Sequence, residues 1–196
     1  MRLKAARIKP LPDEMIGDEI RHQLGEQFKD QPVLNVFKTL GKSLKAYRRF
    51  MAWGGYILSS NNDLNPRDRE LIILRTGYNW QSGYEWAQHA RIGRACGLSE
   101  EEISRIKIGP EAPQWSDRDR ALLNATDDLT SNAFISEGNW AALSDFSEKQ
   151  QMDIVMTVGQ YTQVSMMLNS FVVQLDAGYT LDPDLDGRQQ IRSEKL

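Results

Sequence analysis

Residues 65–103 read NPRDRELIILRTGYNWQSGYEWAQHARIGRACGLSEEEI. Asn65 is a favoured N-cap residue and Pro66 suits the first position of a helix, so a helix is expected to begin here. Gly83 separates this helix from a second one, which Gly97 is expected to end. The stretch therefore predicts two consecutive helices joined by a short turn.

The rest of the chain also has helical periodicity, and no segment alternates polar and apolar residues as a strand does. Capping-box or similar spacing predicts helix starts at Ser99, Ser116 and Ser147, and Ser136 is expected to cap a short helix. Further helices are expected over residues 13–24, 43–58 and, as the longest, 147–175. The sequence therefore predicts an all-α fold.

The length of 196 residues suits a single domain. We expect a basic N-terminal arm over residues 1–12, a helical domain over 13–175 and a polar C-terminal tail over 176–196. The tail has few apolar residues to bury, so it is expected to be disordered or to lie as an arm on a neighbouring subunit.

The composition excludes several classes of protein. The chain has 24 basic and 27 acidic residues, a balance that gives no positive field to hold nucleic acid. Its longest apolar runs are far shorter than the roughly 20 residues that span a bilayer. Residues 1–14 lack the apolar stretch of a secretory signal, so a cytoplasmic location is the default expectation. The single cysteine, Cys96, excludes an internal disulfide, a CxxC pair and a cysteine-rich zinc site.

Two segments of the chain resemble each other: residues 67–71 read RDREL and residues 118–122 read RDRAL. Each is expected to open a capped helix, where an Asp in the first turn is favoured by the helix dipole. Shared capping chemistry accounts for the likeness, and internal duplication is the alternative.

One stripe of the second predicted helix carries candidate acid and base residues. Positions three and four apart share a helix face, which aligns Ser82, Glu85, His89, Ile92 and Cys96. The polar end of this stripe is expected to line a cleft and the apolar end to fill a core. Glu85 beside His89 would favour the charged imidazole and form an acid and base pair. The alternative is an ordinary surface pair, and His22 is expected to be a surface residue. No metal site is predicted, because this stripe has neither a second His nor a repeated Glu-x-x-His pattern.

The segment RDRELIILRTGYNWQSGYEWAQHARIGRACGLSEEEI resembles the carboxymuconolactone decarboxylase family, which includes the alkylhydroperoxidase D (AhpD) proteins. The resemblance is strong over residues 65–106 and implies an AhpD-like helical bundle. In the peroxidase branch a Glu is followed after eleven residues by Cys-x-x-Cys and, after three more, by His. That pattern falls on Glu70, Ser82, Glu85 and His89, so both cysteines are replaced. A hydroxyl and a carboxylate cannot run a dithiol cycle, and the resemblance therefore favours the decarboxylase side of the family.

The resemblance implies a lyase that uses acid and base chemistry, without a cofactor, on a small carboxylated or lactone-type substrate. In this hypothesis His89, supported by Glu85, transfers the proton, Glu70 is a second acid or base or orients His89, and Ser82 donates a hydrogen bond to substrate. Arg75 is a candidate for binding a substrate carboxylate, as is Arg91. Trp86 and Tyr161 are candidates for the substrate cleft. The alternative function is a non-catalytic binding or scaffold protein, and an alkylhydroperoxidase activity is not expected.

The predicted C-terminal helix is apolar on nearly every side, which is typical of a helix at the centre of a domain or at a subunit interface. The family resemblance implies a homo-oligomer formed through this helix. A core helix of a monomer is the alternative.

Overall fold

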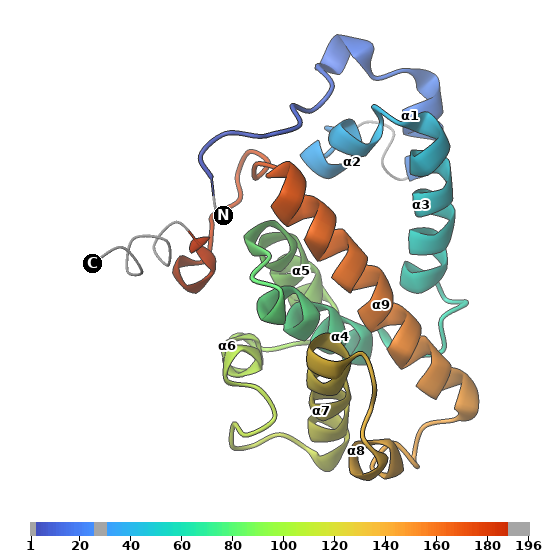
Figure 1. The fold of residues 1–196 in the computed structure, drawn as a ribbon, viewed down its shortest axis with the longest axis vertical. Helices are drawn as coiled ribbons and strands as arrows, with labels where there is room; N and C mark the ends of the chain where they lie inside the picture. The colour runs from blue at the N-terminus through green and yellow to red at the C-terminus, as the bar shows by residue number, and fades with distance from the viewer. Residues whose placement is uncertain (1–2, 26–30, 188–196) are drawn as a thin grey trace.

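The computed structural model describes residues 3–25 and 31–187, and these residues form helices and no strand (Figure 1). The all-α prediction is confirmed. In chain order the helices are the 3-10 turn η1 (Asp13–Met15), α1 (Asp18–Leu24), α2 (Asn35–Leu40), α3 (Leu44–Leu58), α4 (Pro66–Asn79), α5 (Gly83–Ala95), α6 (Glu100–Ile108), α7 (Asp117–Asn132), α8 (Glu137–Ala141), α9 (Glu148–Phe171) and the 3-10 turn η3 (Pro183–Leu185). None of them is both long enough and apolar enough to cross a membrane within the described part of the chain.

Local capping sets the beginnings of the main helices, as the sequence predicts. The backbone N–H three residues further on donates to the side chain of each of four caps, Asn65, Ser99, Ser116 and Ser147. The caps of α6 and α9 are complete capping boxes. Ser136 precedes α8 as predicted, but its hydroxyl donates to Asp128 at 2.7 Å and makes no cap bond.

Two helix boundaries differ from the prediction. Residues 13–24 do not form one helix, because Gly17 takes an extended conformation and separates η1 from α1. The last long helix ends at Phe171 rather than near residue 175. Val172 adopts the left-handed conformation there, with φ of 55°, and its N–H closes the helix on the carbonyl of Leu168.

Helix α4 occupies the centre of the molecule, where it contacts α5, α6, α7 and α9 (Figure 1). All of its residues from 68 to 77 are buried. Helix α9 is buried along one side only, since Met152, Val155 and Met166 are exposed on the other. Some of the apolar residues of α9 therefore pack in the core, and others lie on an exposed surface.

The two similar segments meet each other at the contact of α4 with α7. Arg67 Nη1 is 2.7 Å from Asp119 Oδ1, and Arg118 Nε is 2.9 Å from Asp68 Oδ2. The Arg of each segment thus pairs with the Asp of the other. The residues that the two segments share therefore form ion pairs between α4 and α7, and they also favour the beginnings of both helices.

The C-terminal segment packs on this chain's own α5. Tyr84 and Gln88 donate to Asp176 at 2.5 Å and 2.9 Å, and Leu185 is fully buried in the core beside Gly83. The expectation of a disordered tail or an arm on another subunit is wrong for residues 176–187, because Asp176 and Leu185 anchor the segment. Residues 188–196 lie outside the described residues.

The predicted N-terminal arm, residues 1–12, lies against the end of α9 in its described part. The backbone N–H groups of Arg7 and Ile8 both donate to the carbonyl of Phe171, at 3.0 Å and 3.2 Å. Residues 1–2 lie outside the described residues. Both ends of the helical domain are thus tied to the body of the molecule.

Candidate acid and base site

His89 lies between two carboxylates where α4 meets α5. Its Nδ1 atom is 2.7 Å from Oε2 of Glu70, and its Nε2 atom is 3.0 Å from Oε1 of Glu85. Glu70 belongs to α4, whereas Glu85 and His89 are one turn apart on α5. The structure therefore brings together three of the residues that the sequence singles out.

Two glycines allow α4 and α5 to come close at this point. A Cβ atom on Gly77 would lie 3.2 Å from Cγ of Glu85. A Cβ atom on Gly93 would lie 3.3 Å from Cδ1 of Leu74 and 3.8 Å from Cβ of Glu70. Close-packed helices have little room for such an atom without a shift of the neighbour. The absent side chain of Gly77 thus leaves room for Glu85, and that of Gly93 leaves room for Leu74.

The imidazole of His89 is buried together with its two partners. The three residues are 7%, 1% and 4% exposed for His89, Glu70 and Glu85. Burial by itself lowers the pKa of His89, but the charges and hydrogen bonds of Glu70 and Glu85 outweigh it and raise the pKa to about 10. With its pKa raised in this way, His89 is an imidazolium at neutral pH that donates from Nδ1 to Glu70 and forms an ion pair with Glu85 on the side of Nε2. Among the described residues, no group of three or more His, Cys, Asp or Glu side chains is arranged to hold a metal ion.

Tyr161 of α9 covers the same imidazole. Its ring packs edge-on against His89 with ring centroids 4.9 Å apart and an angle of 83° between the planes. Burial, followed by the charges of Glu85 and Glu70, raises the pKa of Tyr161 well above its usual value. The hydroxyl is therefore protonated at neutral pH beside the two carboxylates. Tyr161 joins the cluster, which we define as Glu70, Glu85, His89 and Tyr161.

Ser82 is the N-cap residue of α5, but its side chain makes no cap bond. Its Oγ atom is fully buried and has no hydrogen-bond partner among the described residues. The next residue, Gly83, is covered by Leu181 and Leu185 of the C-terminal segment, which approach so closely that a Cβ there would meet Leu181. Ser82 thus has a buried hydroxyl without a hydrogen-bond partner among the described residues, at the beginning of α5 and next to the C-terminal segment of the same chain.

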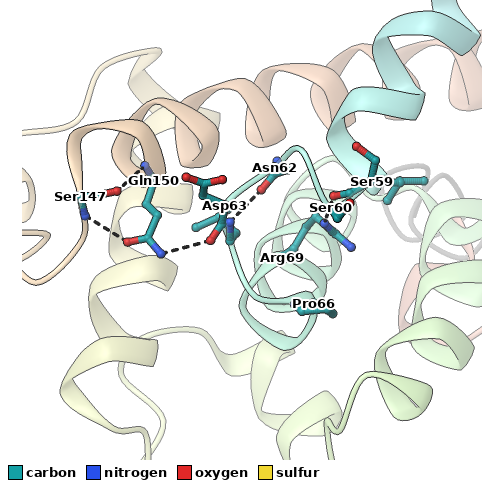
Figure 2. A pocket seen from close by; sticks show the side chains of 10 residues that line it. Ser59, Ser60, Asn62, Asp63, Pro66, Arg69, Ser147 and Gln150 are labelled. Atoms are coloured by element: carbon teal, nitrogen blue, oxygen red, sulfur yellow. Dashed lines mark hydrogen bonds between the residues drawn. The ribbon is translucent and has the colours of Figure 1, made fainter.

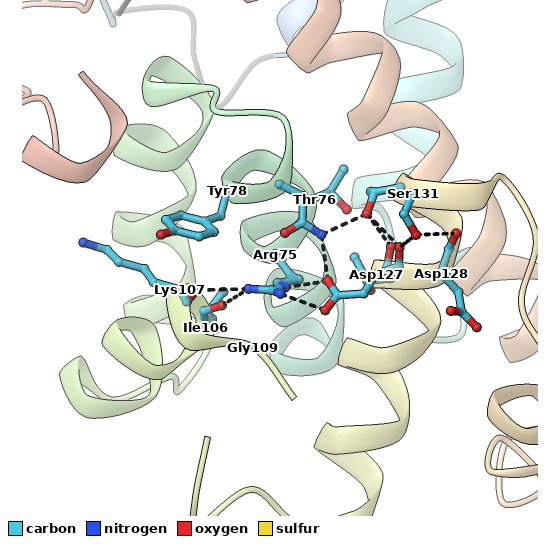
Figure 3. A network of polar contacts seen from close by, with 12 residues as sticks. Arg75, Thr76, Tyr78, Ile106, Lys107, Gly109, Asp127, Asp128 and Ser131 are labelled. Carbon is cyan, nitrogen blue, oxygen red and sulfur yellow. Dashed lines mark hydrogen bonds and ion pairs between the residues drawn. The ribbon is translucent and has the colours of Figure 1, made fainter. Parts of the chain in front are cut away.

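Arg75 lies outside the cluster, in a network of its own (Figure 3). Its Nε and Nη2 atoms donate to the carboxylate of Asp127 at 2.6 Å and 2.7 Å, and Nη1 donates to the carbonyls of Ile106 and Lys107. These contacts join α4 to α7 and to the end of α6. The geometry gives Arg75 a structural role, because its donors are already occupied within the protein.

Trp86 lies in the hydrophobic core around α4. Its ring is 5.7 Å from that of Tyr78, and the ammonium of Lys107 lies 5.5 Å from its centroid. It shares this core with the buried Leu185. The structure thus places Trp86 among packing residues rather than in the wall of a cleft.

The apolar end of the predicted stripe does not fill a core. Ile92 is 40% exposed, and Cys96 at the end of α5 is only partly buried. Gly93, the next position around the helix, faces Leu74 of α4 instead. The expectation for Ile92 is wrong, because α5 turns that side toward solvent in its second half.

Sequence reasoning missed an open pocket next to Arg69, with a volume of about 670 Å³ (Figure 2). Its walls come from the loop after α3, the beginning of α4 and the beginning of α9, and its lining residues are Leu58, Ser59, Ser60, Asn62, Asp63, Leu64, Pro66, Arg69, Ser147 and Gln150. Neither Glu70, Glu85 nor His89 belongs to this lining. The sequence pattern does not indicate this pocket, apart from the position of Arg69 directly before Glu70.

Known proteins resemble this chain in sequence and in fold. Residues 45–128 match the sequence model of the Carboxymuconolactone decarboxylase family. No curated protein matches the chain in sequence. An AhpD-type protein of unknown function from Agrobacterium tumefaciens is 26% identical, with 70% of this chain and 95% of that chain covered and a TM-score of 0.66.

Two further solved structures share the fold over nearly the whole chain. A peroxidase-related protein from Ralstonia eutropha JMP134, with an alkylhydroperoxidase AhpD core, is 22% identical over 92% of this chain and 96% of that chain, with a TM-score of 0.76. The debrominase Bmp8, in a cysteine-to-alanine variant, is 12% identical over 89% of this chain and 94% of that chain, with a TM-score of 0.73. Residues 45–128 of this chain therefore resemble the carboxymuconolactone decarboxylase family in sequence, and its helices have the AhpD-like fold.

Proposed function

We propose that the protein is an acid and base catalyst that acts on a small carboxylated or lactone-type molecule. The observation that carries this proposal is the buried imidazole of His89, held at 2.7 Å and 3.0 Å from the carboxylates of Glu70 and Glu85. Such a buried cluster holds a proton away from solvent, where the proton can be transferred efficiently to a bound substrate.

The raised pKa of His89 supports one direction of proton transfer in this proposal. An imidazole with a pKa of about 10 carries its proton at neutral pH, so His89 acts as a proton donor rather than as a base. Its Nδ1 atom is engaged with Glu70, which leaves Nε2, on the side of Glu85, as the donating atom. Glu70 orients the ring, and Glu85 stabilises the positive charge of the imidazolium until the proton is transferred.

The proposed reaction is a decarboxylation. The bond between the substrate carbon and its carboxylate breaks, carbon dioxide leaves, and the electron pair passes into a dienolate conjugated with the lactone. His89 then gives its proton to the carbon that lost the carboxylate. A weak acid of this kind suits the protonation of a strongly basic carbon.

The single cysteine supports placing the chain in a branch without the redox pair. A dithiol peroxidase cycle needs two cysteines that form a disulfide, and the chain has Cys96 alone. Burial, together with Glu70, also raises the pKa of the Cys96 thiol, which keeps it in the unreactive protonated form.

A second function, binding of a small molecule without catalysis, is favoured by one observation. The pocket beside Arg69 is not lined by Glu70, Glu85 or His89. One neighbour with this fold, the debrominase, is in complex with 2,3,4-tribromopyrrole, a small ring. The two functions differ in whether a substrate reaches Nε2 of His89.

A homo-oligomer through the C-terminal helix, in the cytoplasm, belongs to the same proposal. The exposed apolar side chains of Met152, Val155 and Met166 on α9 support such an interface. Their exposure in a single chain leaves apolar surface that a second copy can cover.

The experiment uses carboxymuconolactone as the probe and measures carbon dioxide release. The unaltered protein is expected to turn it over, and His89→Gln and Glu85→Gln are each expected to lower kcat by about 100-fold or more, the usual scale for a catalytic acid. His22→Gln is the matched control, because His22 is an exposed histidine. Unchanged turnover in both His89→Gln and Glu85→Gln contradicts the proposal. No turnover by the unaltered protein favours the binding function.

A further inference from the structure

The pocket beside Arg69 is built from parts that favour a negative charge. The beginnings of α4, at Pro66, and of α9, after Ser147, both line it. Helix N-termini carry a partial positive charge and stabilise anions. Figure 2 shows the side chain of Arg69 reaching from α4 toward Ser59 and Ser60 in the loop after α3.

Arg69 is a buried cation without an acidic partner among the described residues. It is 8% exposed, its Nη1 donates to the carbonyl of Ser59 at 3.1 Å, and its buried Nε has no hydrogen-bond partner there. The other arginines of α4 are neutralised, since Arg67 pairs with Asp119 at 2.7 Å and Arg75 with Asp127 at 2.6 Å. A buried guanidinium without a counter-charge is costly, and a bound anion would remove that cost.

The one carboxylate among the lining residues, that of Asp63, does not neutralise Arg69. Asp63 is paired with Lys149, whose Nζ atom is 2.9 Å from Oδ1 of Asp63 and 3.0 Å from Oδ2 of Asp153. The two carboxylates share that ammonium, and neither pairs with Arg69. Within the part of the chain that the structure describes, the guanidinium of Arg69 therefore has no carboxylate paired with it.

The other lining residues of the pocket indicate which kind of anion would fit. Leu58, Leu64 and Pro66 provide apolar surface, and Ser60 and Gln150 provide polar groups at the rim. A guanidinium matches the two oxygens of a carboxylate. We propose that this pocket binds the carboxylate of a small organic acid that carries an apolar ring or chain, with Arg69 as the recognition residue. This binding does not depend on catalysis at His89, because the lining of the pocket excludes the residues of that cluster.

Isothermal titration calorimetry with benzoate tests the proposal. Benzoate is expected to bind the unaltered protein, and the uncharged analogue benzamide and inorganic phosphate are expected to bind at least tenfold more weakly. Arg69→Gln is expected to weaken benzoate binding at least tenfold. Arg49→Gln, which removes an equal charge from an exposed position of α3, is expected to leave the affinity unchanged.

A second pair of variants tests the pocket without removing a buried charge. Ser60→Trp fills the pocket from its exposed rim and is expected to abolish benzoate binding. Asn61→Trp, at the neighbouring exposed position outside the lining, is expected to retain it. Equal benzoate affinity in the unaltered protein, Arg69→Gln and Ser60→Trp overturns the proposal. So does the absence of benzoate binding, or binding of benzamide or phosphate as tight as that of benzoate.

Discussion

His89 shows how two neighbouring carboxylates decide the protonation state of one side chain. Its pKa of about 10 lies well above the ordinary value of 6.5, although burial acts in the opposite direction. We expect both ring nitrogens to carry protons at pH 7 and the ring to titrate only near pH 10. Nitrogen-15 NMR of the imidazole measures this, with His22 as the internal reference for an exposed ring. Titration of His89 near the ordinary value contradicts the assignment.

The same shift predicts how stability depends on pH. The pKa of His89 is higher in the folded chain than in the unfolded one, so its contribution is complete below pH 6.5 and is lost as the pH rises through about 10. At low pH, His89→Gln is expected to destabilise the fold by roughly 3 to 5 kcal/mol, because both carboxylates lose their buried partner. Urea unfolding of the two proteins between about pH 6 and pH 10 measures the difference. We expect this difference to shrink with rising pH, and a constant difference would count against the pairing.

Cys96 is the only cysteine of the chain, and its surroundings favour the protonated thiol. Burial, then the charge of Glu70, raises the pKa of its thiol, and the lowering by Arg69 and His89 is smaller. We expect neither the unaltered protein nor Cys96→Ser to consume peroxide in a reductant-coupled assay. Peroxide consumption that disappears in Cys96→Ser would reverse this conclusion.

At the scale of elements, the close approach of α4 to α5 makes the site possible. Gly77→Ala puts a Cβ atom 3.2 Å from Cγ of Glu85 and is expected to destabilise the protein by about 1 to 3 kcal/mol. It should also lower the pKa of His89, since it moves Glu85 away. Gly55→Ala on α3 is the matched control, because nothing lies within 4 Å of the added atom, and it should leave the protein equally or more stable. Thermal unfolding and the His89 titration check both effects, and unchanged values in Gly77→Ala would show that this contact is unimportant.

Helix beginnings were predictable because capping is local. Asn65, Ser99 and Ser147 receive their hydrogen bonds from only three residues away. The end of α9 was less predictable, because residues 172–175 are as apolar as the helix before them and nothing in their local pattern stops it. It is the left-handed Val172 that ends α9, and the carbonyl of Phe171 beside it accepts hydrogen bonds from Arg7 and Ile8, which are distant in the sequence.

At the scale of the whole molecule, the exposed side of α9 predicts association. We expect the protein to form a homo-oligomer at micromolar concentration, and Met166→Glu to dissociate it because a charge would then be buried at the interface. Ile108→Glu is the matched control, since Ile108 is 65% exposed on α6, away from α9. Size-exclusion chromatography with light scattering gives the mass of each. A monomeric unaltered protein, or an oligomer that survives Met166→Glu, would exclude an interface through this face.

The sequence alone determined the all-α fold, the capped beginnings of the main helices and the pairing of Glu85 with His89. These features depend on residues at most four positions apart, so they can be predicted from the local sequence pattern. Only the tertiary structure decided that Glu70, nineteen positions away, takes the other imidazole nitrogen, and that Asp127 neutralises Arg75. It also decided that Arg69 has no such partner among the residues 3–25 and 31–187. A charge pair between distant segments depends on how helices pack and leaves no periodic sign in the sequence.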